Sequence, residues 1–484
     1  MASSRTRPTL ADPLEALLIE RVRAALAAAQ PVPPAEAFLL SAPRRSRSAK
    51  APVIVALSGG RDSVALLDLV GRVAASRSAP VKNVVAVHVH HGLSPQAEAW
   101  AEHCRLLAER LGVGFELARV KVRARGHGIE AAARLVRYEA LAAAAHAHGA
   151  RIVLAAHHLD DRLETFLIQW MRGAGADGLA GFPAERAFAD GSLRLVRPFI
   201  DTPRIDIEAY VAMRGLAYVD DDSNEDTRLL RNALRLQVLP VMDAARPGFR
   251  AAAARSIDLV AEAADVLRSV AEEDLAHCVG AAATLRVDRL LALPVPRQAL
   301  VLRAWLASHG VEPPARGRLL EALRQVREAR SDARLLVRIG RMELRRFRAH
   351  LVLREAETTA PSAWQFEWKG ESEMAVPVWG GVLHFTRTDG VGFDSTWLAA
   401  SPLELRGRAG GERFKPEALR PSKTLKRLFQ EAAIPEFERA RLPLLWRGDD
   451  LIFVAGLGAD ARRLENEGDR VAIEWRADRG LIAF

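Results

Sequence analysis

The sequence is poor in cysteine and in long apolar runs, and each shortage excludes a class of protein. Its 484 residues contain two cysteines, Cys104 and Cys278, which form neither a CxxC pair nor a metal-binding cluster. Both lie in helical patterns and are typical of small core residues. No segment approaches the roughly 18 uninterrupted apolar residues of a membrane-spanning helix, and the N-terminus has no apolar signal-peptide core. We therefore expect a cytoplasmic protein without a membrane partner.

Basic residues outnumber acidic ones, which favours a nucleic-acid partner. The chain has 69 lysines and arginines against 60 aspartates and glutamates, a formal net charge of +9. A GC-rich genome would also give an arginine-rich composition, without any nucleic-acid partner. Only a local concentration of charge would separate the two explanations. Arginines dominate residues 297–354 and alternate there with apolar residues, as at Arg345 and Arg346. We interpret this stretch as strands with a basic, phosphate-binding face.

Strand and helix patterns alternate between residues 51 and 245. Strands are predicted at 53–57, 84–89, 115–120 and 152–156, and helices at 63–75, 95–111 and 129–148. This alternation predicts an α/β fold, a parallel Rossmann-like sheet with helices on both faces. Ligands of such sheets bind at the carboxyl ends of the strands.

A glycine-containing loop follows the first predicted strand. It consists of Ser58, Gly59, Gly60, Arg61, Asp62 and Ser63. The glycines allow backbone N–H groups to approach an anion, and the start of the next helix adds positive potential. The serines can donate to phosphate oxygens and Asp62 can hold Mg²⁺. The loop is not a Walker A motif, because no Gly-Lys-Ser/Thr follows; an ordinary strand-to-helix turn is the alternative.

Polar clusters also follow the second and fourth predicted strands. His88, His90 and His91 come after the second strand, and His157, His158, Asp160 and Asp161 come after the fourth. The first group could simply be polar residues leaving a strand. The second could be a zinc site, but adjacent histidines rarely bind one metal and no HExxH is present. We favour Asp161 and Glu164, one helical turn apart, as partners of Mg²⁺ or of a nucleophile; helix capping by Asp160 or Asp161 is compatible with this role.

These motifs resemble a known family. The loop at 58–63 is similar to the SGGxDS pyrophosphate loop of the N-type ATP pyrophosphatases, whose sheet is adenine-nucleotide alpha-hydrolase-like. Further motifs narrow the resemblance to the tRNA(Ile)-lysidine synthetases. They are His88-Val89-His90-His91-Gly92-Leu93, the stretches 132–138, 157–166 and 172–179, and Asp222-Ser223-Asn224 followed by Arg231-Asn232 and Arg235. Arg61 and His90 depart from the residues that are usual at their positions.

The resemblance implies an ATP- and Mg²⁺-dependent ligase. Such an enzyme joins free L-lysine to C2 of the wobble cytidine (cytidine 34) in the CAU anticodon of tRNA(Ile), through an adenylated cytidine, and changes decoding from AUG to AUA. We predict that residues 58–63 bind ATP and that Asp62 holds the metal. The predicted catalytic residues are Asp62, Asp161, Glu164 and Arg231. A carboxylate should bind the lysine ammonium and take its proton, and we favour Asp161 over Glu164 or Asp160.

Other residues are predicted to contact substrate or tRNA. They are His91, Arg134, Arg137, His157, Asp160, Arg235, Arg345, Arg346, Lys423 and Lys426. Lys423, Lys426 and Arg427 should form a basic stripe on a helix that opens at Ser422. For the arginines and for this stripe, a solvated helix face is the alternative. The glycine-rich stretch 173–181 is interpreted as a mobile loop over the site, or else a plain connection.

Four regions are predicted along the chain. They are an N-terminal extension (1–50), the ATP-binding catalytic domain (51–245), a linker helix with a helical/α+β tRNA-binding domain (246–356) and a small β-rich tRNA-binding domain (357–484). An amidotransferase or a tRNA thiolase with the same loop is disfavoured because cysteine machinery is missing. A non-catalytic RNA-binding protein is disfavoured because the acidic residues would hinder RNA binding. The sequence leaves a homodimer open.

Overall fold

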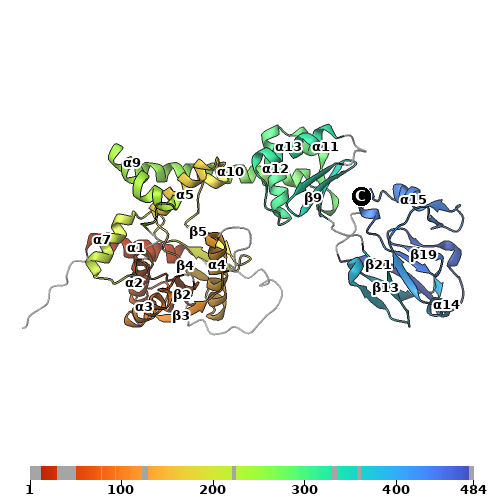
Figure 1. Ribbon diagram of the computed structural model, residues 1–484, viewed down its shortest axis with the longest axis horizontal. Helices are drawn as coiled ribbons and strands as arrows, with labels where there is room; N and C mark the ends of the chain where they lie inside the picture. The colour runs from red at the N-terminus through yellow and green to blue at the C-terminus, as the bar shows by residue number, and fades with distance from the viewer. Residues whose placement is uncertain are drawn as a thin grey trace, which may run out of the picture. The chain divides into compact units, whose positions relative to one another are not determined.

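The computed structural model divides the chain into two compact units, Met1–Val266 and Leu267–Phe484 (Figure 1). It describes residues 12–29, 51–77, 79–92, 94–122, 129–220, 225–329, 335–356 and 361–478. The predicted Asp222-Ser223-Asn224 motif, Leu93, and residues 1–11 and 30–50 of the predicted extension lie outside these ranges. The four predicted regions remain a prediction.

The first unit is built on a six-stranded sheet of order β3-β2-β1-β4-β6-β5. Its strands are β1 (Val53–Ala56), β2 (Val84–His90), β3 (Gly114–Arg119), β4 (Ile152–Leu154), β5 (Glu185–Phe188) and β6 (Leu193–Val196). Neighbours from β3 through β6 pair in parallel, which confirms the predicted fold class. The edge strand β5 runs antiparallel to β6 and was not predicted. Both strands are four residues long, too short for a clear period.

Helices cover both faces of this sheet. On one face lie α1 (Pro13–Ala28), α2 (Arg61–Ala75), α3 (Ala97–Arg110) and α7 (Arg204–Arg214), and on the other lies α4 (Ile129–Ala147). A separate small core joins α5 (Leu159–Met171), α9 (Leu239–Ala245) and α10 (Phe249–Cys278). The remaining helices are α6 (Ala176–Leu179), α8 (Leu230–Ala233) and the π-helical η2 (Leu234–Val238). Alternating strand residues point to opposite faces. Val53 and Val55 of β1 therefore join the core under α1, α2, α3 and α7, whereas Ile54 joins the core under α4.

The chain positions of the predicted helices are confirmed, with one addition. The stretch 173–181, interpreted as a mobile loop, contains the short helix α6. Within the described residues, no helix combines the length and apolar character needed to cross a bilayer.

The second unit contains two cores. One lies between a four-stranded antiparallel sheet and helices; its elements are β7 (Leu285–Arg286), α11 (Val287–Ala292), α12 (Val295–Ser308), α13 (Arg316–Glu328), β8 (Leu336–Ile339), β9 (Met342–Phe347) and β10 (His350–Glu355). The other core belongs to the region that was predicted to be β-rich.

That region contains a five-stranded and a four-stranded sheet, a two-stranded ribbon and three short helices. The elements are β11 (Trp364–Phe366), β12 (Glu373–Val376), β13 (Gly381–Arg387), β14 (Phe393–Asp394), α14 (Ser395–Ala399), β15 (Leu403–Arg406), β16 (Arg413–Phe414), β17 (Lys423–Thr424), α15 (Leu425–Glu431), α16 (Glu436–Arg439), β18 (Leu444–Arg447), β19 (Asp450–Val454), β20 (Gly458–Ala459) and β21 (Arg470–Ala477). The predicted β-rich character is thereby confirmed.

The N-terminal helix α1 is part of the first unit's core. Leu18, Val22 and Leu26 are buried against α2 and α7. Asp12 caps the helix by accepting a hydrogen bond from the Leu14 N–H at 2.8 Å. This helix, assigned to an extension without a function, therefore stabilises the fold that carries the phosphate-binding loop.

Leu18→Ala should lower the free energy of unfolding of the first unit by about 2–5 kcal/mol, because it removes a fully buried side chain. Leu17→Ala is the matched control; Leu17 is 47% exposed, and we expect a change within about 0.5 kcal/mol. Urea unfolding followed by amide hydrogen exchange in this unit measures both. Equal effects of the two variants would contradict the docking of α1.

Candidate active site

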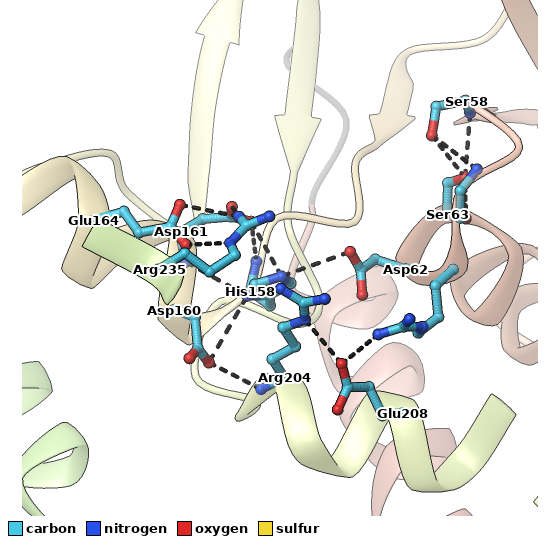
Figure 2. Close-up of polar contacts among 12 residues, drawn as sticks. Ser58, Asp62, Ser63, His158, Asp160, Asp161, Glu164, Arg204, Glu208 and Arg235 are labelled. Carbon is cyan, nitrogen blue, oxygen red and sulfur yellow. Dashed lines mark hydrogen bonds and ion pairs between the residues drawn. The ribbon is translucent and has the colours of Figure 1, made fainter. Parts of the chain in front are cut away.

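The strand order of the sheet reverses direction between β1 and β4. One loop follows β1 on one side of this switch point, and another follows β4 on the other side. The chain leaves β1 for β2 on one side, and β4 later pairs with β1 on the other. The carboxyl ends of β1 and β4 therefore flank the crevice in which ligands of such sheets bind. Figure 2 shows the side chains that follow these strands, Ser58 to Ser63 and His158 to Glu164, gathered in one region.

The loop after β1 is shaped for close approach of an anion. Gly59 has φ +90°, and a Cβ there would lie 3.1 Å from Cys104 Sγ. The Ser58 N–H donates to Ser63 Oγ at 3.2 Å, and Ser63 Oγ donates to the Gly60 carbonyl at 2.8 Å. Gly60 begins α2 without a side-chain cap. The helix N-terminus consequently keeps its backbone donors for a ligand.

Cys104 packs against this loop at Gly59. It is fully buried, and its Sγ lies 3.4 Å from His88 Nδ1, which contacts the Leu57 carbonyl at 2.9 Å. Burial raises the pKa of the Cys104 thiol to about 12. The predicted role of Cys104 as a core residue is confirmed, and its thiol stays protonated at neutral pH.

Arg61 points away from the loop's backbone donors. Its guanidinium forms an ion pair with Glu208 of α7 and lies 3.3 Å from the Tyr218 hydroxyl, with the Tyr218 ring centroid at 4.9 Å. Burial lowers the pKa of Arg61, but Tyr218 and Glu208 outweigh it and the pKa is raised. These contacts link the start of α2 to α7, so the unusual arginine has a structural explanation.

Asp62, His158 and Asp161 meet between the two loops (Figure 2). His158 Nε2 lies 3.6 Å from Asp62 Oδ2 and 3.6 Å from Asp161 Oδ2. Asp161 Oδ2 accepts from the His158 N–H at 3.0 Å and completes a capping box at the start of α5. Burial lowers the pKa of His158, but the two carboxylates outweigh it and raise the pKa.

Asp161 remains ionised despite its burial. Burial raises its pKa, but His158, His157 and the His158 N–H outweigh this effect, so the pKa is lowered. Arg235 lies 3.4 Å from Asp161 Oδ1. A charged carboxylate near the carboxyl end of β4 can bind an ammonium group and accept its proton.

Asp160 is occupied by protein partners. Its Oδ2 accepts from the Arg204 N–H at 2.9 Å, and Oδ1 forms an ion pair with Arg250 of α10. The neighbouring Arg162 is buried and pairs with Asp201 at 2.7 Å and Asp258 of α10 at 2.5 Å. Asp160 thus ties α5 to α7 and α10, and its contact with substrate remains a prediction.

Glu164 is fully buried and held by two arginines. Arg235 binds it in a bidentate manner, with Nε–Oε1 at 2.6 Å and Nη2–Oε2 at 3.0 Å. Arg231 Nε lies 3.6 Å from Oε2, and its Nη2 donates to Thr165 Oγ1 at 3.1 Å. Burial raises the pKa of Glu164, and Arg235 opposes the shift. The predicted residues Glu164, Arg231 and Arg235 thus form one cluster beside Asp161.

Arg197 was missed by sequence reasoning, although it lies next to His157. It directly follows β6 and is 2% exposed. It packs over the Phe182 ring, which lies beside His157. Burial is the main cause that lowers the pKa of His157 to about 4, so this imidazole is neutral. Recognition of β6 as a strand would have directed attention to the residue at its carboxyl end.

The basic residues of α4 lie around Tyr138 and His91. Arg134 packs over the Tyr138 ring with 5.5 Å to the centroid, and Arg137 Nε donates to His91 Nε2 at 3.3 Å. Burial and the nearby Arg137 lower the pKa of His91 to about 4. Within the described part of the chain, no ion pair joins Arg134 or Arg137 to a carboxylate. They remain candidates for phosphate contacts.

The predicted basic residues of the second unit have mixed surroundings. Arg346 Nη1 donates to the carbonyls of Val326 and Ala329 at 2.9 and 2.7 Å, which caps the end of α13. Arg345 pairs with Glu343 at 2.9 Å. Both therefore have structural partners.

The helix predicted to carry the basic stripe begins later than predicted. The helix α15 begins at Leu425, and Lys423 lies in β17. Lys423 and Arg427 both pair with Glu431, at 2.7 and 3.1 Å. Lys426 is exposed, and its contact with tRNA remains a prediction. The chain is extended before residue 425 because Lys423 and Thr424 pair with Phe414 and Arg413.

The donor set suits a hard cation shared with phosphates and not a protein-only metal centre. No group of three or more His, Cys, Asp or Glu side chains that could hold a metal occurs among the described residues. Asp62 Oδ1 is buried and has no hydrogen-bond partner among the described residues. Mg²⁺ commonly takes one or two carboxylates and completes its shell with phosphates and water. Asp62 fits that role.

Comparison with known proteins first gives the class. Residues 37–242 match the PP-loop domain, whose defining loop is the one after β1. Residues 285–352 match the TilS substrate binding domain, and residues 403–475 match the TilS substrate C-terminal domain. The chain is thus a PP-loop protein with two additional family-specific domains.

Whole-chain relatives narrow the class to a family. The tRNA(Ile)-lysidine synthase of Ralstonia nicotianae is 44% identical over 418 residues, covering 84% of this chain and 89% of the relative. That of Chromobacterium violaceum is 41% identical over 417 residues, covering 86% and 93%. The chain belongs to the tRNA(Ile)-lysidine synthase family. Among solved structures, a TilS C-terminal domain is 25% identical with a TM-score of 0.20, covering 24% of this chain and 98% of that domain.

Gly59→Ala should weaken ATP binding on the order of ten-fold, because alanine is strained at φ +90° and its Cβ would press on Cys104. Arg61→Met should change ATP affinity less than about three-fold, since Arg61 is directed to Glu208 and Tyr218. Isothermal titration with ATP measures both. Loss of ATP binding in Arg61→Met as large as in Gly59→Ala would show that Arg61 contacts the nucleotide.

Arg235→Met should destabilise the first unit by about 3–5 kcal/mol at neutral pH, because it removes both close hydrogen bonds from the buried Glu164 and leaves only Arg231, 3.6 Å away. Glu164 already has a raised pKa, and the substitution raises it further. A carboxyl with a raised folded-state pKa stabilises the fold below its unfolded pKa, and this contribution is lost as pH rises through the folded pKa.

The deficit of Arg235→Met should therefore shrink toward pH 5 and grow toward pH 8, as measured by urea unfolding at each pH. The matched control is Arg246→Met, at an exposed arginine, which should show no such trend. A deficit independent of pH would contradict the assignment to Glu164.

Proposed function

We propose that this protein is a ligase that uses ATP and Mg²⁺ to join free L-lysine to C2 of the wobble cytidine of tRNA(Ile), forming lysidine. The observation that carries the proposal is the meeting of Asp62, from the phosphate-binding loop, with Asp161, from the loop after β4, in a chain of this family. One loop suits the phosphates of ATP and the other suits an amine.

The first step would activate the cytosine. The cytosine O2 attacks the α-phosphorus of ATP, the P–O bond to pyrophosphate breaks, and an adenylated cytidine results. The N-terminus of α2 and the backbone around Gly59 and Gly60 would bind the phosphates. Mg²⁺, held by Asp62, would neutralise phosphate charge. The hydroxyls of Ser58 and Ser63, which are 3.0 Å apart and hydrogen-bonded within the loop, would turn to donate to phosphate oxygens.

The second step would transfer lysine. The ε-amine attacks C2, the new C–N bond forms, and the C–O bond to AMP breaks. The amine must lose a proton, and the ionised Asp161 is the group that would bind the ammonium and accept it. Glu164, fully buried and bound by Arg235, would hold the arginines in place and add negative potential.

Basic residues that form no ion pair among the described residues would bind the RNA. Arg134 and Arg137 on α4, without carboxylate partners among the described residues, are suited to phosphates near the anticodon. Lys426 is suited to a contact with a part of the tRNA farther from the anticodon. Arg345 and Arg346 would contribute indirectly, by stabilising the domain in which they lie.

Incubation with tRNA(Ile) transcript, ATP and labelled lysine tests the proposal, and lysine should be incorporated only when the wobble base is cytidine. Asp161→Asn should lower lysine transfer at least about 100-fold while pyrophosphate release persists, because adenylation does not need the base. Asp62→Asn should lower both.

Asp190→Asn, at an exposed position with φ +54° that asparagine tolerates, is the control and should retain both activities. ATP cleavage that ignores lysine and the wobble base would contradict the proposed function. Full ligation by Asp62→Asn would contradict the metal role of Asp62.

A further inference from the structure

Phe182 lies beside the proposed catalytic centre, outside every motif identified from the sequence. Its ring centroid is 5.3 Å from that of His157, with the two planes at 58°. His157 is four residues before Asp161 in the loop after β4. The Phe182 side chain is partly exposed. A partly exposed apolar ring therefore lies against His157, which precedes the group assigned to accept the lysine proton by four residues.

Arg197 holds Phe182 in this place by three contacts. Its guanidinium carbon lies 4.9 Å from the Phe182 ring centroid, and its Nη1 donates to the Pro183 carbonyl at 2.6 Å. Its backbone N–H donates to the Ala184 carbonyl at 2.8 Å. Phe182 is partly exposed despite these contacts and the neighbouring His157 ring, so part of its ring remains accessible.

The surroundings of Arg197 and His157 leave hydrogen-bonding capacity unused. Arg197 has no carboxylate partner among the described residues, and its buried Nε has no hydrogen-bond partner there. His157 Nδ1 is also buried without a partner. Unsatisfied buried polar atoms are uncommon in proteins, and each calls for an explanation such as a catalytic role or a water or ion that is not present. Phe182, His157 and Arg197 thus form a wall that combines an aromatic ring, a neutral imidazole and positive charge.

A pyrimidine base fits this wall. Enzymes that react with a nucleobase take it out of the stack and place it against aromatic side chains. A neutral cytosine can stack on a ring that is backed by a guanidinium. The carboxylates of Asp161 and Glu164 suit the amine instead.

We propose that Phe182 is the stacking platform for the target cytosine, that His157 lies beside the base, and that Arg197 is a positioning residue that fixes Phe182. The inference rests on the proposed function, because it names where that reaction's base would lie. It adds a base-binding element between α6 and β5 to a site otherwise built from the loops after β1 and β4.

Fluorescence of tRNA(Ile) carrying pyrrolocytosine at the wobble position tests the stacking. Wild-type enzyme should quench the fluorophore. Phe182→Leu should remove the quenching and weaken binding on the order of ten-fold, whereas Phe182→Tyr should restore both. Phe115→Leu, at a partly exposed phenylalanine of β3, is the matched control and should behave as wild type. Quenching by Phe182→Leu equal to wild type would overturn the proposal.

Arg197→Lys and Arg197→Met separate positioning from folding. Arg197→Lys keeps the charge, and we expect partial quenching; Arg197→Met should lose quenching while ATP binding, measured by calorimetry, stays within about three-fold of wild type. A purely structural role would lower ATP binding and quenching together, and that result would overturn the positioning role.

Photocrosslinking of the unaltered enzyme makes the test independent of variant folding. A tRNA(Ile) with 5-iodocytidine at the wobble position should crosslink to the peptide that contains Phe182, as identified by mass spectrometry. A crosslink confined to another peptide would overturn the proposal. Lysidine formation by wild type on ordinary tRNA(Ile) is measured alongside, so failure of the proposed function is distinguished from failure of the stacking site.

Discussion

The full burial of the Glu164 carboxylate is the constraint on which the site depends. A buried carboxylate without a partner is costly, and here Arg235 meets it with two hydrogen bonds while Arg231 lies nearby. Arg235 lies in η2, a π-helical turn, and Arg231 in α8. The pair therefore brings a segment more than sixty residues along the chain against α5. Because Asp161 is on the same helix one turn earlier, its position is fixed by the same contact.

The carboxylates of α5 divide into two kinds according to their partners. Asp160 and Glu164 are engaged by arginines and backbone donors, which tie α5 to α7, α10 and η2. Asp161 shares His158 with Asp62 and keeps its charge in the crevice. Neighbouring residues of one motif thus serve different purposes, since successive side chains of a helix point about 100° apart. The motif is a scaffold and a reaction site at once.

The sequence predicted the sheet and its loops well, because their signals are local. Hydrophobic runs marked β1, β2, β3 and β4, and the polar residues after β1 and β4 do meet. The signals failed where partners are distant. The ion pairs of Arg61 with Glu208 and of Asp160 with Arg250 join residues distant in sequence and were not predicted, whereas the ligand contacts predicted for Arg61 and Asp160 remain predictions. Arg197 and Phe182 were missed because the edge hairpin β5–β6 is too short to show a period, and ring stacking has no sequence signature.

Charge composition proved a weak guide to the RNA-binding surface for a physical reason. An arginine carries five N–H donors and is often used to satisfy carbonyls and carboxylates within a fold. Arg346 caps α13, and Lys423 and Arg427 share Glu431. By contrast, Arg134 packs over Tyr138 and has no ion pair among the described residues. Basic side chains without an acidic neighbour are the better candidates for phosphate, and Arg134 of α4 is one of them among the described residues.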